Sequence, residues 1–555
     1  MPLRKSECRV RTYPLDGGVH DLSDDVRAGS ITRTITGDNS FSLSLIDNGN
    51  RHHKVGQTSR GNISIGDWII IETRNERNDW KVRLIGRILN LSKSDVATRN
   101  AGRIHSINVS GMDFIAVFKQ SRIVMDPWIT FSFQKAFQRG WTRQRANLPV
   151  APFVDRQFLN NWSEDIGSSD PQPHKILEIL INSMLGVGLS ADQRFALPAG
   201  PEFSAGINPI LGSARYTPQI LGTPVASNKV THGYAQSIFT FDAGPLANDV
   251  RSPGLKGKCF NREIISFNMN GNTGGSLWDS LVRFSNPGIN ELFMEYPSGR
   301  PVLRFRENPF PCWTGQGSLV SAEIDSEAWD DLNVYEIDHT DISRENVSKS
   351  DNNRFNMFAA VPKGMGHMTV DMSIIPQVHE GLVPIIDFDS VLKHGARPMR
   401  PSVIYSGFES FNNTNPFTWV GIMAQWSIQL AGWFWLNADY LNGQIEVPFL
   451  NDGEVGRKLL KRRIDVRSNS RDALWDEYYI DGVTWSWSVS STGATSGKTT
   501  YSVSRGQERF GGRVTGEGDN KRFIRTSGVL LPDAPGQIQE VNQSLWSPAN
   551  IKFIP

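Results

Sequence analysis

Apolar and polar residues alternate with a period of two along much of the first 128 residues. Residues 31–35 and 41–45 both alternate in this way, and a Gly-Asp-Asn sequence lies between them at 37–39. Side chains of a β-strand point alternately to its two faces, so each segment predicts a half-buried strand. Glycine, aspartate and asparagine favour a tight turn. The pattern therefore predicts a β-hairpin.

Further strand patterns follow along the same segment. Residues 68–71 are a continuous apolar run, which is typical of a buried strand. Residues 82–91 predict a longer strand that bends at Gly86, because a glycine inside a strand often marks a bulge or a barrel corner. The polar residues 92–103 predict a loop, and residues 104–111 predict another strand. Short strands separated by turns indicate a small antiparallel barrel or sandwich.

The middle of the chain mixes helical and strand patterns. Residues 174–186 have apolar side chains on one helical face and end in glycine, so they predict a helix. A second helix is expected at 276–284. The segments 290–296 and 302–306, joined by the turn sequence Pro-Ser-Gly-Arg, predict a hairpin after it.

The pattern of the N-terminal region returns near the C-terminus. Residues 26–45 and 341–357 both read as a strand, a turn rich in Asp and Asn, and a strand that opens with Phe. The long strand at 82–91 has a counterpart at 478–488, which also carries a glycine near its middle, and a further strand follows at 500–504. We interpret this weak repeat as two copies of one small barrel. Chance similarity between two β-rich segments is the alternative.

The expected fold is mainly β with α+β insertions: two similar small antiparallel β-barrels plus intervening mixed domains. The C-terminal residues are rich in glycine and proline with little periodicity, which indicates an extended arm that another chain would hold. The expected domains are a first barrel at 1–128, an α+β insertion at 129–250, a helix–hairpin segment at 251–330, a discontinuous second barrel at 331–362 and 441–510, an aromatic-rich insertion at 363–440, and the arm at 511–555.

Composition narrows the choice of partners. Lys and Arg number 58 against 57 Asp and Glu in 555 residues, so the near-zero net charge favours neither specific nucleic-acid binding nor an anionic membrane. The three cysteines, Cys8, Cys259 and Cys312, are far apart, which argues against a disulfide framework or a CxxC metal site. The N-terminal residues do not resemble a signal peptide, and no apolar run reaches the ~20 residues of a membrane span.

Candidate metal and anion sites were weighed against simpler explanations. His52 and His53 lie in a polar loop, and residues 338–341 place a histidine beside two aspartates. No further Cys or His stands at ligand spacing, so a solvated loop and a turn are the expected roles. The glycine-rich residues 271–276 precede a helix but lack the lysine of a P-loop, so Ser276 is expected only to cap that helix. No metal and no cofactor are predicted.

Candidate catalytic groups are equally sparse. Asp452 and Glu454 flank Gly453, whereas a glycosidase needs two carboxylates across a cleft, a separation that sequence does not show. The chain has no GxSxG motif. We therefore predict no catalytic residue and a protein that is not an enzyme.

Two clusters of larger side chains have alternative interpretations. An aromatic cluster is either an interface or sugar-stacking patch or, as we favour, part of the core. It comprises Trp419, Trp426, Trp433, Phe434 and Trp435. A basic run could meet DNA in a tube lumen, although a solvated face is the favoured interpretation. It comprises Lys458, Lys461, Arg462 and Arg463.

Several of these segments share their strand, glycine and turn pattern with a known family. They are residues 65–70, 84–88, 104–113, 290–310, 478–485 and 501–506. With this pattern the chain resembles the baseplate hub proteins of contractile-tailed phages, which also form the base of type VI secretion spike proteins. The matches cover about half of the chain and include no invariant chemical motif. Residues 131–250 and 363–440 match nothing in the family.

The resemblance implies a structural subunit of the tail baseplate in the virion, assembled in the host cytoplasm. Three chains with two barrels each would form a pseudo-six-fold ring that joins a six-fold tail tube to a three-fold central spike. The implied partners are two further copies of the chain, the tube protein, the spike protein, the tape measure protein and other baseplate subunits. Fused spike or lysozyme-like modules are not evident, so those activities would belong to other chains.

Two rival functions remain open at this point. A receptor- or glycan-binding tail fibre or tip protein is compatible with the tryptophan content, and a cell-wall hydrolase is the less favoured rival. Neither rival requires two copies of a barrel that flank an insertion, so the repeat favours the hub.

Overall fold

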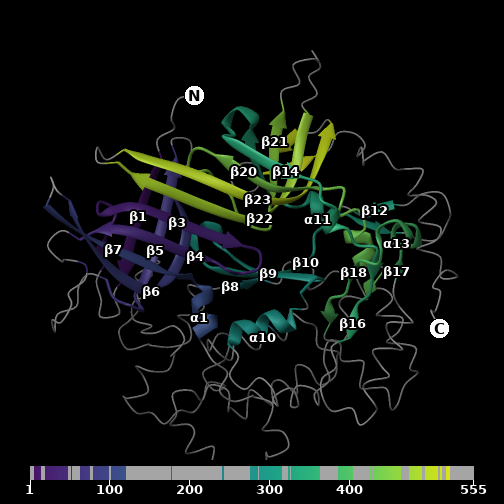
Figure 1. Ribbon diagram of the computed structural model, residues 1–555, viewed down its shortest axis with the longest axis horizontal. Coiled ribbons are helices and arrows are strands. Elements are labelled where there is room, and N and C mark those ends of the chain that lie inside the picture. Colours follow the sequence, from purple (N-terminus) through teal and green to yellow (C-terminus); the bar gives the residue numbers. More distant parts are fainter. Residues whose placement is uncertain are drawn as a thin grey trace, which may run out of the picture.

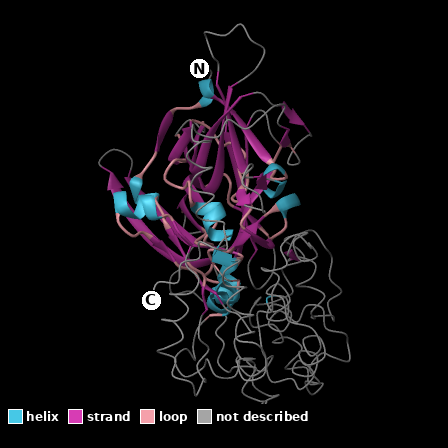
Figure 2. Cartoon of the chain, turned by 90° about the vertical axis from the view of Figure 1, so that its right-hand side faces the viewer, coloured by secondary structure: helices cyan, strands magenta, loops and turns pink. Residues whose placement is uncertain are grey.

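The fold is taken from a computed structural model in which strands predominate and helices are short (Figure 2). The structure describes residues 6–13, 19–47, 52, 63–75, 79–98, 102–120, 177, 240–242, 276–285, 287–314, 323–325, 327–362, 385–403, 426–427, 429–463, 474–490, 494–510, 513–515 and 521–524. No helix among these residues is both long and apolar enough to cross a bilayer.

Six antiparallel strands from the N-terminal region form a first unit of the main sheet (Figure 1). Their order across the sheet is β3-β4-β7-β6-β5-β1, and the short β2 lies beyond β1 at the edge. The predicted hairpin is confirmed as β3 and β4, and Gly37 in its turn has φ 78°. The strands are β1 (Ser6–Tyr13), β2 (His20–Asp21), β3 (Val26–Thr34), β4 (Ser40–Ile46), β5 (Trp68–Asn75), β6 (Lys81–Thr98) and β7 (Gly102–Asp113).

Six later strands form a second unit with the same arrangement. Their sheet order is β14-β20-β23-β22-β21-β13. When the six strands of each unit are numbered along the chain, with β2 left out, both units have the order 2-3-6-5-4-1 across the sheet. One difference is that β13 runs parallel to β21, whereas β1 is antiparallel to β5. The strands are β13 (Val334–Asp338), β14 (Arg344–Ser348), β20 (Leu441–Val447), β21 (Lys458–Arg463), β22 (Leu474–Val489) and β23 (Thr495–Phe510).

The two units also match in backbone detail. The N–H of Gly66 donates to the carbonyl of Ile88 at 2.8 Å, and the N–H of Gly456 donates to that of Ile480 at 2.9 Å. In return, the N–H of Ile88 donates to the carbonyl of Asp67 at 3.0 Å, and the N–H of Ile480 donates to the carbonyl of Arg457 at 2.9 Å. Both glycines have positive φ, 92° and 73°, which a residue with a Cβ adopts only under strain. We call this pair of reciprocal backbone hydrogen bonds the backbone bracket. Because it recurs in both units, Ile88 and Ile480 are equivalent.

A β-bulge follows the bracket in each unit, between Ile88 and Asn90 and between Ile480 and Gly482. The irregularity expected at Gly86 lies elsewhere: the register of β6 shifts against β7 after Ile88, and against β5 between Val82 and Leu84. Gly86 has a different role, because a Cβ there would lie 2.2 Å from the carbonyl oxygen of Met112 on the neighbouring strand.

The two units share one continuous sheet, because β22 pairs with β3. The result is a 13-stranded, curled half-barrel, which confirms a mainly β fold but joins the two barrels into one sheet. A single hydrophobic cluster spans both units and includes Ile31, Leu43, Ile445, Trp485 and Tyr501, each buried. The units are therefore packed as one body around one core.

Two local predictions are wrong. The predicted loop 92–103 largely continues the ladder of β6 and β7, which pair from Ser92↔Asn108 to Thr98↔Gly102. Residues 341–357 do not form a hairpin, since β14 pairs with β20, while the next strand belongs to another sheet. In both places polar residues gave a turn-like sequence, but backbone pairing with a distant strand decided the structure.

Smaller elements lie around the main sheet. The predicted helix and hairpin after residue 276 are confirmed as α10, β9 and β10, and β10 also pairs in parallel with β8. The predicted helix at 174–186 lies outside the described residues except for Leu177. The bounds are α1 (Ile115–Gln120), β8 (Thr240–Asp242), α10 (Leu277–Phe284), β9 (Asn290–Glu295), a 3-10 helix (Pro297–Gly299), β10 (Val302–Glu307), β11 (Cys312–Thr314), β12 (Glu323–Asp325) and α11 (Glu327–Asp330).

The C-terminal half carries further short elements. They are 3-10 helices at His339–Asp341 and Asp351–Asn353, strands β15 (Met357–Phe358), β16 (Val361–Pro362), β17 (Ile385–Ile386), β18 (Pro398–Met399), β19 (Ser402–Val403), β24 (Arg513–Thr515) and β25 (Arg522–Ile524), and α13 (Phe388–His394). β24 and β25 pair with each other, so the expected arm begins with a small hairpin. Beyond residue 524 the arm lies outside the described residues.

Candidate functional site at the junction of the two units

The junction of the two units is an antiparallel strand pair. β3 and β22 pair from Ala28↔Ser488 to Thr34↔Gly482. In the middle of this pair the hydroxyls of Thr32 and Thr484 lie 3.2 Å apart. The junction is therefore an uninterrupted backbone ladder with a contact between two threonine side chains near its middle.

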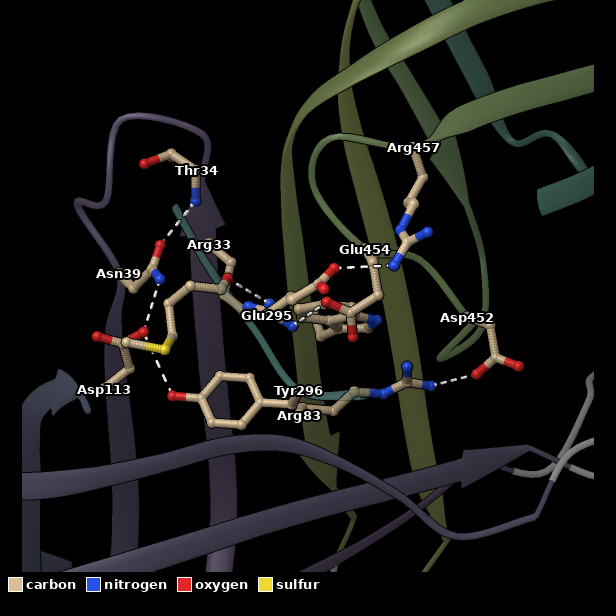
Figure 3. Close-up of polar contacts among 12 residues, drawn as sticks. Arg33, Thr34, Asn39, Arg83, Asp113, Glu295, Tyr296, Asp452, Glu454 and Arg457 are labelled. Carbon is tan, nitrogen blue, oxygen red and sulfur yellow. Dashed lines mark hydrogen bonds and ion pairs between the residues drawn. The ribbon is translucent and has the colours of Figure 1, made fainter. Parts of the chain in front are cut away.

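Arg33, on β3, is buried at the junction and contacts residues from distant parts of the chain (Figure 3). Its Nη1 lies 2.6 Å from Oε2 of Glu454, and its Nη2 donates to the carbonyl of Met294 at 2.8 Å. Burial lowers the pKa of Arg33, but Glu454, Tyr296 and Asp113 together more than offset this, so the pKa lies above its usual value. The guanidinium stays charged and ties the first unit to the second.

Glu295, at the end of β9, is the second buried carboxylate here. It forms ion pairs with Arg304 and, at 2.8 Å, with Nη2 of Arg457. Burial raises the pKa of Glu295, but the two arginines outweigh burial and hold it below its usual value. The β9–β10 hairpin is thereby fastened to the loop before β21.

Asp113, at the end of β7, ends a chain of polar contacts that begins in the β3–β4 turn (Figure 3). The backbone N–H of Thr34 donates to Asn39 Oδ1 at 2.8 Å, and Asn39 Nδ2 donates to Asp113 Oδ2 at 2.6 Å. The hydroxyl of Tyr296 lies 3.3 Å from the same carboxylate. Burial raises the pKa of Asp113 to about 6, although the hydrogen bonds from Asn39 and the Ile115 amide oppose the shift.

Asp452 forms another bridge between the units. Its carboxylate lies 2.5 Å from Nη2 of Arg83 and 3.2 Å from Nζ of Lys81, both on β6. Burial raises the pKa of Asp452, but the two cations hold it below its usual value. The Arg83 guanidinium also lies 5.1 Å from the ring centroid of Trp485, a cation–π contact with β22.

Arg505, on β23, links the second unit to the aromatic insertion. Its guanidinium lies 3.5 Å from the ring centroid of Phe310 and 4.7 Å from that of Phe434, and Nη1 donates to the carbonyl of Trp433 at 2.8 Å. Burial lowers the pKa of Arg505 to about 10. These contacts are structural, because they involve ring faces and a backbone carbonyl rather than an open site.

Besides the outer sides of β2 and β13, two strand edges of the main sheet have no neighbouring strand within the described part of the chain. One is the outer edge of β14, which pairs only with β20. The other is the outer half of β6, because β5 pairs only with residues up to Arg87, while β7 covers the opposite edge. Exposed strand edges are sites where another chain can add a strand.

The two histidine predictions have different outcomes. His52 is buried, and its Nε2 lies 2.8 Å from Asp25 Oδ2, so the expected solvated loop is wrong at this residue. His53 lies outside the described residues. The turn expected at 338–341 is confirmed: His339 starts a 3-10 helix, and its Nδ1 lies 3.0 Å from Asp338 Oδ1 at the surface. No cluster with metal-ligand composition exists among the described residues.

The carboxylate and glycine-rich candidates have structural roles. Asp452 and Glu454 are both engaged with arginines of the first unit, as described above. Ser276 caps α10 as predicted, because its hydroxyl accepts from the N–H of Asp279 at 3.1 Å. Residues 271–275 lie outside the described part of the chain.

The aromatic and basic clusters are partly as predicted. Trp426 and Trp433 are buried, which confirms the core interpretation for these two, whereas Trp419 lies outside the described residues. The solvated face predicted for the basic run is wrong for two lysines. Lys458 is buried with Glu477 at 2.9 Å, and Lys461 is buried 3.0 Å from Asp476, whereas Arg462 is exposed.

Sequence reasoning missed the buried arginines at the junction. A signal for Arg33 was present, because it stands two residues after Ile31 in an alternating strand and so shares the face of a core residue. A charged residue at an inward position of a strand indicates a buried ion pair, but only the fold identifies its partner 421 positions later as Glu454.

Comparisons with known proteins found no matching family model and no matching curated protein. Among solved structures, the 43 kDa tail protein of prophage MuSo2 from Shewanella oneidensis aligns at TM-score 0.39 and 11% identity, over 90% of this chain and 98% of that one. Prophage tail protein gp18 from Listeria monocytogenes aligns at TM-score 0.35 and 10% identity, over 90% and 95%.

A third solved structure is an E. coli component of the type VI secretion system, itself described as similar to the bacteriophage T4 tail proteins gp27 and gp5. It aligns at TM-score 0.30 and 7% identity, over 87% of this chain and 73% of that one. TM-scores below 0.5 are too low to assign a common fold, so we base the function on the chain's own topology.

Proposed function

We propose that this chain is a non-enzymatic structural subunit of a phage tail: a baseplate hub protein that assembles as a homotrimer. The observation that supports the proposal is the duplicated six-strand unit, whose two copies take the same strand order and are joined through β22 and β3. Three such chains supply six similar units. A ring of this kind has three-fold symmetry, and its six similar units give it approximate six-fold symmetry.

The proposed ring would join the six-fold tail tube to the three-fold central spike, and would also contact the tape measure protein and other baseplate subunits. Its place would be the tail baseplate of the virion, after assembly in the host cytoplasm. Two features support a role as a framework. The acidic and basic groups at the junction are buried in ion pairs, and among the described residues no strand covers the outer edge of β14 or the outer half of β6, where other copies of the chain would dock.

The buried tryptophans weigh against the rival glycan-binding function. A sugar-stacking patch needs exposed ring faces, but Trp426 and Trp433 are buried. The indole N–H of Trp435 donates to Asp387 Oδ2 at 2.9 Å, which ties this ring to the cap of α13.

Measuring the mass of the purified full-length chain in solution tests the proposal. Native mass spectrometry and sedimentation should both give three chain masses at micromolar concentration. A chain that stays monomeric, or forms only dimers, would overturn the trimeric hub.

A further inference from the structure

We infer that β14 of one chain pairs antiparallel with the outer half of β6 in the next copy, with Ser348 opposite Ser92. The inference rests on the proposed ring, because it names the surfaces through which one copy of the chain would meet the next. It follows from the internal duplication alone: each unit has the same two edges, and one pair of these edges is already joined inside the chain.

The first step is the equivalence of β6 and β22. The backbone bracket and the bulge superpose Ile88 on Ile480 and Asn90 on Gly482. Counting onward from the bulge, Ser92 corresponds to Thr484. This part of β22 is covered by β3, whereas the same part of β6 has β7 on one edge and no strand of the described chain on the other.

The second step is the equivalence of β14 and β3. β3 pairs with β4, which pairs with β7 of the β6–β7 hairpin, and β14 pairs with β20, which pairs with β23 of the β22–β23 hairpin. Val109 of β7 and Tyr501 of β23 lie at equivalent places after the bulge, and they pair with Leu43 and Ile445, which are therefore equivalent. Leu43 of β4 lies opposite Gly29, and Ile445 of β20 lies opposite Glu345. Counting three residues further along each strand, Ser348 corresponds to Thr32.

The two equivalences together fix a register. Inside the chain, Thr32 lies opposite Thr484, with 3.2 Å between their hydroxyl oxygens. Replacing each by its counterpart in the other unit places Ser348 of one chain opposite Ser92 of the next. The proposed pair therefore repeats a small hydroxyl residue facing another at the same point of the ladder.

Exposure agrees with this interface. Four of the five residues of β14 are exposed, and so are Ser92 and Lys93 on β6. The register places Glu345 opposite Asp95, a pair of like charges. Glu345 is held by Lys461, whose Nζ lies 2.7 Å from Oε1, and this cation offsets the charge of Glu345. Charged and polar side chains on an open edge discourage pairing with unrelated strands while leaving a matched partner free to dock.

The two edges are different surfaces, so the contact is head-to-tail. A head-to-tail contact closes into a ring when its rotation divides a full turn, and otherwise grows into a filament. In the proposed ring, the contact between chains repeats the β3–β22 contact within each chain. Both the β14 edge and the outer half of β6 are then paired in every chain of the ring.

Cysteine cross-linking tests the register in the full chain. In a background with Cys8, Cys259 and Cys312 replaced by serine, the double variant Ser92→Cys/Ser348→Cys should oxidise to covalent products that end at three chains on a non-reducing gel. A disulfide needs Cβ atoms about 3.5–4.5 Å apart, so a two-residue shift abolishes it. The register control Asn90→Cys/Ser348→Cys should therefore give at least tenfold less product.

Two further controls make each outcome decisive. Thr32→Cys/Thr484→Cys should close within one chain and give no oligomer, which confirms that this ladder position accepts a disulfide. Chains with Ser92→Cys alone, mixed with chains carrying Ser348→Cys alone, should stop at covalent dimers. Products longer than three chains would support the edge pairing but overturn the trimer. A trimer by mass that gives no cross-link at this register would overturn the inference and leave the trimer standing.

Discussion

At the scale of single residues, the junction depends on charges that are buried in pairs. Arg33 and Glu454 come from different units, and both side chains are largely removed from water. A buried ion pair gives a modest net stabilisation, since the attraction is offset by the loss of hydration, but losing one partner leaves an uncompensated charge. The arrangement therefore specifies which surfaces meet more than it adds to stability.

The variant Arg33→Met should lose about 3–5 kcal/mol of unfolding free energy, because it leaves the carboxylate of Glu454 buried without its nearest cation. The double variant Arg33→Met/Glu454→Met should recover more than half of that loss, since neither charge remains. Urea unfolding followed by tryptophan fluorescence measures both. A double variant as unstable as the single one would show that the pairing is not the cause.

The titration of Asp113 predicts a pH dependence. Its folded pKa, about 6, lies above the ordinary aspartate value of 3.8, so the folded state holds the proton more tightly than the unfolded chain does. The unfolding free energy should therefore fall as the pH rises from about 4 to 6, by at most about 3 kcal/mol from this group. Above pH 6 this contribution should be constant.

The variant Asp113→Asn should flatten that part of the profile. Chemical unfolding at pH 4, 5, 6 and 7 measures the slope, and the comparison uses slopes because the amide also disturbs the contact with Asn39. An unchanged slope in the variant would assign the effect to another group.

At the scale of elements, each unit places a glycine with positive φ before a β-bulge. In the first unit a Cβ on Gly66 would add backbone strain. In the second, a Cβ on Gly456 would also lie 2.6 Å from the Phe293 ring. Gly456 therefore combines backbone strain with crowding.

The substitution Gly66→Ala should cost about 1–2 kcal/mol from backbone strain. Gly456→Ala should cost roughly 1–3 kcal/mol beyond such strain, because Phe293 must also move. Thermal unfolding of the two variants measures both losses. A loss of only about 1–2 kcal/mol in Gly456→Ala would contradict the crowding at Gly456.

Local pattern predicted the elements with strong periodicity and missed those decided by distant pairing. The alternation at 31–35 and 41–45 predicts β3 and β4, and Ser276 predicts the start of α10. The ladder at 92–98 and the pairing of β14 with β20 could not be predicted in this way, because both depend on partners elsewhere in the chain, at 102–108 and 442–446. The ion pairs at the junction depend on the same long-range topology.

At the scale of the whole molecule, the duplicated unit accounts for the shape of the sheet. One junction, β3 with β22, is satisfied inside the chain, and the equivalent edges, on β14 and on the outer half of β6, have no neighbouring strand among the described residues. A sheet with matched open ends is built to continue into another copy of itself. Repetition of the internal junction between chains is therefore the central claim.

Electron microscopy of the purified full-length chain tests this claim most directly. Averaged images should show a closed ring of three chains in which six similar β-units alternate around the axis. Separate monomers, two-fold dimers or open filaments would contradict it.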